Sequence, residues 1–222
     1  MKINRHGKAK ILSVEEIQLL FSQGLLLPRD RALFGICLYA AARIKEACTL
    51  RTADVYSRQG VVRNILIIRK DSTKGKLATR SIPVIEELRL LLMDYYPSPR
   101  TWFMFPGRHG RGHIHSDSAA RILREACQRV GIEGASSHSF RRTSLTQMSS
   151  QGIPLRVIQE ISGHRNLDEL QKYLEVRPDQ VLGAVSTLSM LSHVGKTTYD
   201  GVEIEGEEKS LVKEENEPPK SK

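Results

Sequence analysis

The strongest constraint on the fold of this chain is a set of reactive side chains that its second half spaces at helix-length intervals. His138 and Arg141 are three residues apart, so on a helix they share one face. A second helix-length stretch ends at the pair Gly163-His164, and Tyr173 comes nine residues after His164. Because glycine commonly ends a helix, we expect Tyr173 on a separate short helix. A fold that joins these residues must therefore bring three helical segments together.

Together these side chains supply one guanidinium, two imidazoles and a phenol. A tyrosine phenol has a pKa of about 10, so it needs help to lose its proton before it can attack. Attack on a phosphodiester builds negative charge on the phosphate oxygens, and arginine meets such charge with two parallel hydrogen bonds. Imidazoles can move the phenol proton, and a lysine can protonate the leaving sugar oxygen. The set indicates attack of a tyrosine on a phosphodiester, with cationic side chains in place of a metal ion.

The first half of the chain offers two further cations for such a site. Arg43 follows the alanine run 40–42, and Glu46 lies three residues later, where its carboxylate can orient the guanidinium. Lys74 lies in a turn between two apolar stretches, and Lys76 is two positions away, so both lysines stay candidates. Taken alone, Arg43 also fits a surface arginine paired with Glu46, and Lys74 also fits a solvated turn residue.

The apolar pattern predicts an α+β fold that is mostly helical, with one small antiparallel sheet. Residues 61–68 are rich in β-branched side chains and residues 77–84 alternate, which predicts a β-hairpin with Lys74 near its tip. Helical patterns surround the hairpin, and Ser116 is expected to cap the helix that follows it. We expect helices over residues 14–23, 28–39, 85–95, 116–130, from 136 or 137 to near 152, 154–162 and 178–191.

Charge divides the chain into three expected parts, namely a basic arm over residues 1–12, a main domain over residues 13–195 and an acidic tail over residues 196–222. The tail holds 5 basic and 8 acidic residues and few apolar ones, so we expect it to be disordered. Its net charge of −3, within the +9 of the whole chain, leaves +12 for the residues before it. Such a basic body favours a polyanion partner, with nucleic acid as the leading candidate, although a merely soluble basic protein fits the charge as well.

The cysteines and the apolar segments indicate the cellular compartment. Cys37, Cys48 and Cys127 are scattered without a CxxC pair, which is typical of buried free thiols in a reducing compartment. The N-terminus is basic and polar and lacks the apolar run of a signal peptide. No uninterrupted apolar segment is long enough to cross a membrane. We therefore expect a cytoplasmic protein without a membrane partner.

A glycine-rich basic loop over residues 108–115 adds three histidines, His109, His113 and His115. They could gather a metal ion, but no cysteine or carboxylate alternates with them at ligand spacing. We expect instead a loop that contacts phosphates, without a bound metal or cofactor. The arginines expected to bind DNA are Arg108 and Arg111 in this loop and Arg142 beside Arg141.

Read in order, these motifs resemble the tyrosine recombinase family, also called the phage integrase family. The segments that carry the resemblance are residues 41–50, Thr73-Lys74, residues 138–143, Gly163-His164 and Tyr173. The likeness spans about residues 13–191, essentially the catalytic domain of that family. It implies the family's catalytic fold, double-stranded DNA as the partner and no cofactor.

The resemblance implies that Arg43 and Arg141, the two arginines of the family motif, bind the scissile phosphate. His164 stands where the family has His or Trp and would hydrogen-bond the same phosphate. Glu46 matches the family's acidic residue that supports the site. The alanine run before Arg43 departs from the Gly or Leu that the family usually has there.

The resemblance also implies the chemical steps. Tyr173 would be the nucleophile that forms a 3′-phosphotyrosyl link to DNA, and His138 would be the general acid and base. Lys74 would protonate the leaving 5′ oxygen. A free 5′ hydroxyl attacks the link to rejoin the strands, so the reaction would need neither ATP nor a metal ion. The implied function is that of a site-specific DNA recombinase or integrase.

Assembly and two rival functions stay open. Family members usually carry a separate helical DNA-binding domain before the catalytic one, whereas about a dozen residues precede the first helix expected here, as in a minimal recombinase or an excised domain. We expect a monomer in solution that assembles as a homo-tetramer on DNA. The apolar stripe within residues 181–191 would dock on a neighbouring copy or pack on its own core. The rivals are a type IB topoisomerase-like DNA relaxer and a non-catalytic DNA-binding regulator on the same scaffold.

Overall fold

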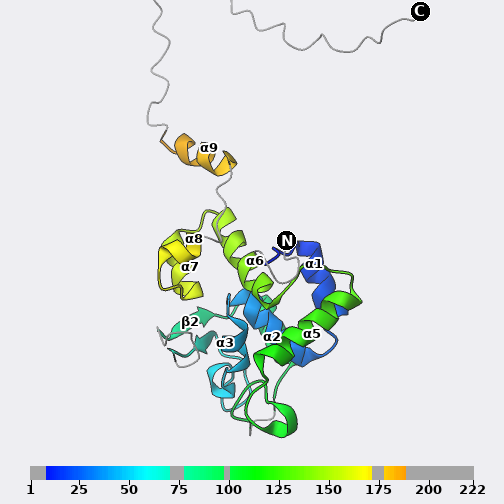
Figure 1. The fold of residues 1–222 in the computed structure, drawn as a ribbon. Helices are drawn as coiled ribbons and strands as arrows, with labels where there is room; N and C mark the ends of the chain where they lie inside the picture. Colours follow the sequence, from blue (N-terminus) through cyan, green and yellow to red (C-terminus); the bar gives the residue numbers. More distant parts are fainter. Residues whose placement is uncertain (1–8, 71–77, 98–100, 172–177, 189–222) are drawn as a thin grey trace, which may run out of the picture. The chain divides into compact units, whose positions relative to one another are not determined.

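The structure, a computed structural model, describes residues 9–70, 78–97, 101–171 and 178–188 (Figure 1). The described residues up to Gln180 belong to one compact unit and those from 181 to 188 to a second unit, and each is described by itself. In the described part the first unit is mostly helical and has a two-stranded antiparallel sheet, so the predicted fold class is confirmed. None of the described helices is long and apolar enough to span a membrane.

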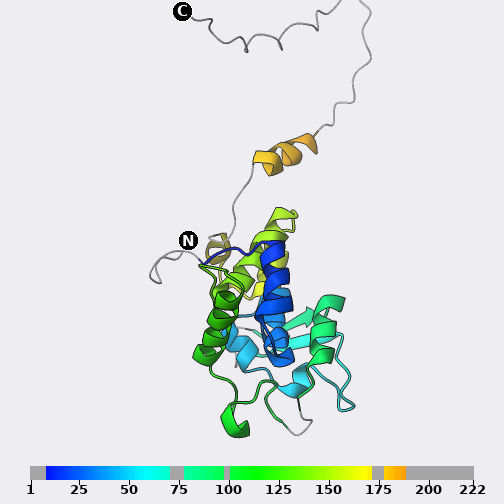
Figure 2. The same cartoon turned by 90° about the vertical axis from the view of Figure 1, so that its right-hand side faces the viewer.

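Each helix expected from the sequence has a counterpart in the structure. The helices are α1 (Val14–Leu19), α2 (Pro28–Tyr39), α3 (Ile44–Cys48), α4 (Glu86–Asp94), α5 (Ser116–Arg129), α6 (Ser137–Ser150), α7 (Leu155–Ser162), α8 (Leu167–Gln171) and α9 (Pro178–Ser186). The strands are β1 (Ile65–Ile68) and β2 (Arg80–Pro83). Figures 1 and 2 show the hairpin at the edge of the helical layer that α1, α2, α5 and α6 form.

The helix α1 starts at a capping box formed by Ser13 and Glu16. The Glu16 amide donates to Ser13 Oγ over 3.2 Å, and the Ser13 amide donates to Glu16 Oε2 over 3.1 Å. These bonds satisfy two of the amides that a helix leaves unpaired at its N-terminus. A π-helical turn over Leu20–Gly24 extends the helix and contacts α5.

The helix α2 is the centre of the core. After a charged first turn, its residues 32–38 are all apolar and all buried, so the buried side chains lie on all of its faces, as this run predicts. It contacts α3, α4 and α6, and the rings of Phe34 on α2 and Phe140 on α6 stack with their centroids 5.4 Å apart. Burying one such ring stabilises the fold by about 1.5–3 kcal/mol. The packing therefore fixes α6, which carries part of the predicted site, against the segment that leads to Arg43.

The strands β1 and β2 pair antiparallel, with Leu66 opposite Ile82 and Ile68 opposite Arg80. All four side chains lie on the buried side of the hairpin, which makes Arg80 a charged residue in an apolar position. The helix α7 packs against β2. The tip of the hairpin, residues 71–77, lies outside the described residues.

Two helix ends differ in how well the sequence predicts them. The prediction that Ser116 caps α5 is wrong, because Ser116 is the first helical residue and His115 has the extended backbone of the cap. His115 Nδ1 accepts the Asp117 amide over 3.3 Å. The end of α7 is as expected, since Gly163 has a φ of 63°, in the left-handed region that favours glycine.

The three cysteines are buried free thiols, as predicted. Burial raises the pKa of Cys48 to about 12 and that of Cys127 to about 11. Both side chains therefore stay protonated at neutral pH and act as small apolar core residues.

Candidate active site

Glu46, on α3, is a buried carboxylate that two arginines share. Its side chain is 1% exposed. Glu46 Oε1 accepts from Arg43 Nη1 over 3.0 Å, and Glu46 Oε2 accepts the Arg43 amide over 2.8 Å. The same Oε2 accepts from Nη2 of Arg80 over 2.5 Å. Since an ionised carboxylate can accept several hydrogen bonds at once, Glu46 holds the Arg43 guanidinium in one orientation.

Arg80, on β2, is a member of this cluster that the sequence motifs missed. Its side chain is 5% exposed, and its Nη1 donates to the carbonyl of Ile161 at the end of α7 over 2.6 Å. Strand alternation was the available signal, because Arg80 and Ile82 are two residues apart and so face the same, buried side. A charged side chain is almost never fully buried without a partner, so the alternation alone predicts an ion pair here.

Arg141, on α6, is only 3% exposed. Its Nη1 donates to the carbonyl of Ala41, and its Nη2 donates to the carbonyl of Ser162 over 2.8 Å. Ala41 has a φ of 45°, an uncommon conformation for a residue with a side chain, and it lies two residues before Arg43. The guanidinium therefore ties α6 to the segment before α3 and to the end of α7.

His164 lies against Arg141 and is 6% exposed. Arg141 Nη2 is 3.2 Å from His164 Nε2, and Ser162 Oγ is 2.8 Å from His164 Nδ1. Burial and the charges of three arginines, first Arg141 and then Arg43 and Arg80, lower the pKa of His164 to about 3. The ring is therefore neutral at neutral pH and has one donor and one acceptor nitrogen. Because arginine can only donate, Nε2 is the acceptor and Nδ1–H donates to Ser162, a tautomer assigned from these contacts.

Of the other predicted catalytic residues, the structure describes only His138. His138, on the first turn of α6, is exposed, whereas Arg141 one turn later is buried. Tyr173 comes two residues after the end of α8, and Lys74 belongs to the hairpin tip, so both lie outside the described residues. The described part of the chain thus holds the predicted phosphate-binding half of the site.

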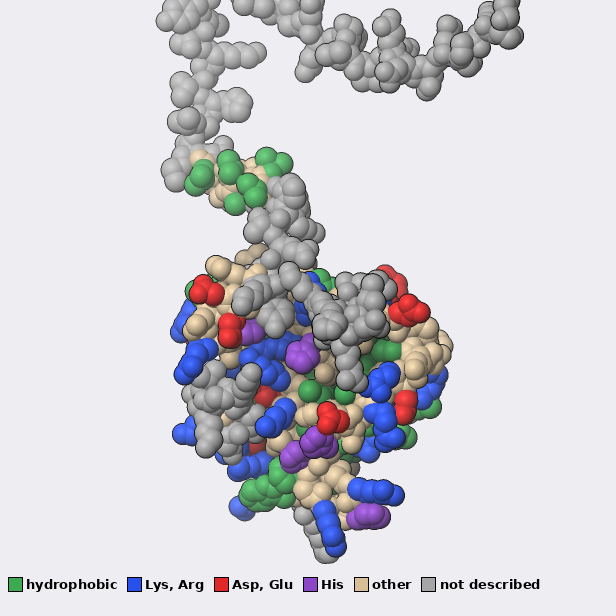
Figure 3. Space-filling model, in the orientation of Figure 1, with side chains coloured by type: hydrophobic (Ala, Val, Ile, Leu, Met, Phe, Trp, Pro, Cys, Tyr) green, Lys and Arg blue, Asp and Glu red, His purple; other side chains and the backbone are tan. Residues whose placement is uncertain are grey.

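The arginines expected to bind DNA lie in two places. Arg108 begins a 3₁₀ turn, Arg111 follows its last residue, and both are exposed. Arg142 is half-buried and donates to the carbonyl of Ala9, so it fastens the first described residues to α6. Figure 3 shows Lys and Arg side chains spread over one face of the first unit, with histidines among them. That face is electrostatically suited to a polyanion, and the DNA contacts of the three arginines stay predictions.

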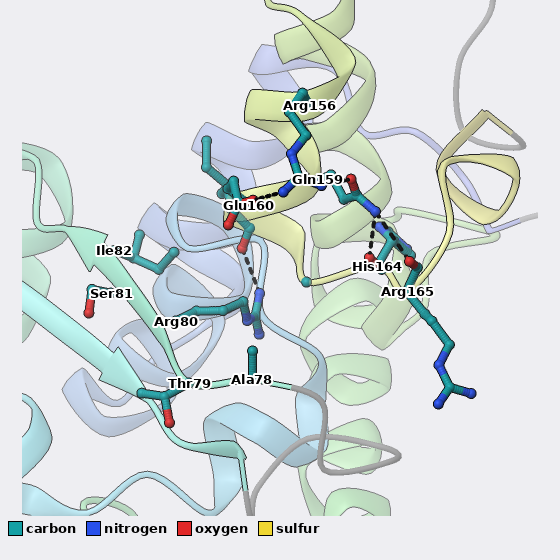
Figure 4. Close-up of a pocket in the computed structure, with 12 residues that line it drawn as sticks. Ala78, Thr79, Arg80, Ser81, Ile82, Arg156, Gln159, Glu160, His164 and Arg165 are labelled. Carbon is teal, nitrogen blue, oxygen red and sulfur yellow. Dashed lines mark hydrogen bonds and ion pairs between the residues drawn. The ribbon is translucent and has the colours of Figure 1, made fainter.

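A cleft of about 580 Å³ opens between β2 and α7, beside the cluster. Figure 4 shows Arg80 reaching from β2 towards the end of α7, with His164 and Arg165 beyond that end. Three guanidiniums, a neutral imidazole and one carboxylate leave this region with an excess of positive charge, which suits an anion such as a phosphate. Among the residues that the structure describes, no three His, Cys, Asp or Glu side chains gather where they could hold a metal ion.

A sequence model of the phage integrase family matches residues 12–180. The chain belongs to this family. The match includes the β-hairpin and every residue from Arg43 to Tyr173 that the sequence motifs single out. The resemblance stated from those motifs is therefore confirmed.

Curated relatives are tyrosine recombinases of greater length. A tyrosine recombinase of Thermosipho africanus is 28% identical over 163 residues, which cover 72% of this chain and 54% of that protein. Tyrosine recombinase XerA of Pyrococcus furiosus is 27% identical over 191 residues, which cover 83% of this chain and 64% of the relative. This chain therefore spans between about half and two thirds of the length of these relatives.

Solved structures share the fold. A crystal structure of XerA recombinase aligns with a TM-score of 0.66 at 21% identity, over 84% of this chain and 68% of that one. XerH site-specific recombinase bound to its difH substrate aligns with a TM-score of 0.61 at 20% identity, over 85% of this chain and 57% of that one. At these identities the likeness shows the fold, and it is the tyrosine recombinase fold that the sequence predicts.

Proposed function

We propose that this chain carries the catalytic domain of a site-specific DNA recombinase that cuts and rejoins duplex DNA through a 3′-phosphotyrosyl intermediate. The observation that supports this most is the gathering of Arg43 and Arg141 around a buried, neutral His164. Three segments far apart in the sequence supply these residues, and each residue is held by hydrogen bonds within the protein. Membership of the phage integrase family points to the same chemistry.

The cluster acts as a preorganised clamp for the scissile phosphate. Backbone carbonyls hold the Arg141 guanidinium, and Glu46 holds that of Arg43, so neither needs to be ordered when DNA binds. Donors fixed in this way each accelerate a reaction by roughly a hundred- to a thousandfold, because they meet charge that develops in the transition state. In the tautomer assigned above, the Nδ1–H of His164 is held by Ser162, and its Nε2 accepts from Arg141. The neutral ring therefore orients the Arg141 guanidinium for the phosphate without a further charge to bury.

The bond changes follow from the residues that the family motif supplies. The phenol oxygen of Tyr173 attacks phosphorus, and the bond from phosphorus to the 5′ oxygen breaks. His138 takes the phenol proton as general base, and Lys74 gives a proton to the leaving 5′ oxygen as general acid. Rejoining reverses these steps, with the 5′ hydroxyl of a second strand as nucleophile. One phosphodiester bond is exchanged for another, so the cycle needs no ATP, and the arginines supply the positive charge that a metal ion would otherwise bring.

Duplex DNA is the proposed partner, and exchange between two duplexes requires four active sites. We infer a monomer in solution that assembles as a tetramer on its DNA site. The related XerH is bound to a difH substrate in its solved structure, which supports a specific duplex as the target here.

A covalent-trapping assay tests the proposal. Sheared genomic DNA from the source organism is nicked and then incubated with the protein. Where a nick lies close to the cleavage site, the short released fragment diffuses away, so the strand cannot be rejoined. Covalent adducts that are stable to detergent are then recovered. Wild-type protein should form such adducts on a defined site. Tyr173→Phe should form none and still bind DNA, because it loses only the nucleophilic oxygen. Tyr96→Phe, which alters an exposed tyrosine elsewhere, is the matched control and should form adducts normally.

Three outcomes would contradict the proposal. Adducts that persist in Tyr173→Phe would show that another residue is the nucleophile. Adducts at sites without sequence preference, with relaxation of supercoiled plasmid by a monomer, would indicate a topoisomerase-like relaxer. DNA binding without any adduct in the wild type would indicate a regulator.

A further inference from the structure

Arg80 connects three parts of the site without facing solvent. Its Nη2 donates to Glu46 on α3, and its Nη1 donates to the carbonyl of Ile161 at the end of α7. Its side chain also packs on Gly163, where an added Cβ would lie 2.7 Å from Arg80 Cδ and 2.9 Å from Nε. Figure 4 shows the side chain running from β2 to α7 beside the cleft. The residue therefore determines how closely the hairpin, α3 and the end of α7 approach one another.

Stability alone is a poor reason for an arginine at this position. Burial lowers the pKa of Arg80, even though the charge of Glu46 opposes that effect, so the environment penalises the cation. Arg80 Nε is buried and has no hydrogen-bond partner among the described residues. Ion pairs buried in this way are often replaced by apolar side chains without loss of stability. The other buried positions of the hairpin, Leu66, Ile68 and Ile82, are apolar, so a role in the site explains the arginine better.

The contacts of Arg80 lead directly to the residues that bind the phosphate in the proposed reaction. Glu46, which Arg80 holds by Oε2, holds Arg43 by Oε1. Ile161, whose carbonyl Arg80 holds, precedes Ser162, and Ser162 contacts both Arg141 and His164. The Arg80 guanidinium thus connects Glu46, which holds Arg43, to the turn at Ser162, which holds Arg141 and His164.

We propose that Arg80 is a positioning residue that fixes the distance between Arg43 and the Ser162–His164 turn, and so shapes the phosphate clamp. It acts through Glu46 and Ile161, because its two terminal nitrogens already donate to these residues. The inference rests on the proposed recombinase function for its kinetic consequence. Its structural consequence, the fixed state of His164, stands independently of that function.

Three variants separate positioning from general stability. Arg80→Met removes the fork and keeps a long side chain. Arg80→Lys keeps the charge but reaches only one of the two partners. Arg31→Met is the matched control, because Arg31 likewise donates one nitrogen to a carbonyl, that of Leu25, and another to a carboxylate, that of Asp94 on α4, away from the site.

Two measurements are made on each full-length variant. The first is the single-turnover rate at which each variant cleaves the DNA site recovered in the covalent-trapping assay, measured at saturating DNA, together with the Kd for that DNA. We expect Arg80→Met to cleave about a hundredfold more slowly, the size of loss that a misplacement of about 1 Å produces, with its Kd nearly unchanged. Arg80→Lys should fall between Met and the wild type, and Arg31→Met should cleave normally.

The second measurement is NMR of the His164 ring nitrogens near neutral pH. Wild type should show one neutral tautomer with the proton on Nδ1, held by Ser162. In Arg80→Met the turn is no longer held, so the two tautomers should exchange, while Arg31→Met should keep the wild-type signal. A merely structural role would lower the melting temperature and leave this signal unchanged.

The inference is overturned if folded Arg80→Met keeps the single tautomer, or if it cleaves like the wild type. If Arg80→Met does not fold, the same two readouts on Arg80→Lys decide, and wild-type values there overturn it. A wild type that forms no adduct refutes the proposed function instead, and the tautomer measurement still tests Arg80.

Discussion

A change of pH should test the buried, neutral state of His164 through the stability of the fold. Burial and three nearby arginines lower its pKa from 6.5 to about 3. Between these two values the unfolded chain binds a proton at this position and the folded chain does not. Stability must therefore fall as the pH drops below about 6.5, since protons favour the state that binds them.

The size of the effect follows from the two pKa values. Each pH unit between the two pKa values changes the free energy of unfolding by about 1.36 kcal/mol. Between about pH 8 and about pH 5, only the roughly 1.5 pH units below the unfolded pKa of about 6.5 contribute. His164 alone should then lower the free energy of unfolding by about 2 kcal/mol at about pH 5. Because the residue is only 6% exposed, solvent screening reduces this figure little. Single domains have total stabilities of only about 5–15 kcal/mol, so the loss is readily measured.

Urea unfolding of wild type and of His164→Gln at both pH values provides the assay. The variant has its own stability, but it carries no titrating group at this position. Each protein loses some free energy of unfolding between about pH 8 and about pH 5. The difference between these two losses isolates His164, since all other titratable groups are present in both proteins. We expect the wild type to lose about 2 kcal/mol more than the variant.

Equal losses in the two proteins, within about 0.5 kcal/mol, would refute this reasoning. They would mean that His164 takes up a proton in the folded state about as readily as in the unfolded chain. Arg141 would then face an imidazolium at the 3.2 Å contact, and the tautomer assigned above would be wrong.

Three further predictions concern the reaction and the chain end. If Lys74 is the general acid, Lys74→Ala should cleave normal DNA very slowly and be largely rescued by a substrate with sulfur as the bridging 5′ atom; the same pattern in Lys76→Ala instead would move the assignment by two positions. Cleavage should survive excess EDTA, and abolition with rescue by Mg²⁺ would contradict the metal-free proposal. If the last helix docks on a neighbouring copy, deleting residues 178–222 should leave a folded protein that cuts single sites but does not recombine two, whereas deleting only residues 196–222 should change neither activity. A truncated protein that melts at a much lower temperature, or that recombines normally, would contradict docking on a neighbour.

Much of the fold could be predicted because local patterns and long-range packing agree. The apolar run of α2 has no polar face, so it can only be a core helix. The β-branched residues of the first strand and the alternation of the second predict the hairpin, and the structure supplies its register, with Leu66 opposite Ile82. The cap of α5 was missed, because a histidine ring that accepts an amide proton competes there with the commoner serine hydroxyl.

The site was predicted less completely, for a physical reason. The order of the charged motifs identifies Arg43, Arg141 and His164, which the structure brings together. Backbone carbonyls anchor Arg141, and a carbonyl has no signature in the sequence because every residue carries one. The turn at Ala41 was equally hidden, since a left-handed conformation is usually announced by glycine or asparagine and alanine stands there.

The anchors of the three arginines differ in charge, and this difference sets the net charge that a phosphate would meet in the proposed reaction. Arg43 and Arg80 share the carboxylate of Glu46, so the two cations and one anion have a net charge near that of a single arginine. Arg141 is anchored by neutral carbonyls and keeps its full charge. In the proposed reaction a phosphate would therefore meet two positive charges of similar size, one from the cluster around Glu46 and one from Arg141, beside a neutral His164 that adds none. Glu46 lies between the two cations and offsets their mutual repulsion while no phosphate is bound. We therefore expect the arrangement of Arg43 and Arg80 in the empty site to depend on Glu46.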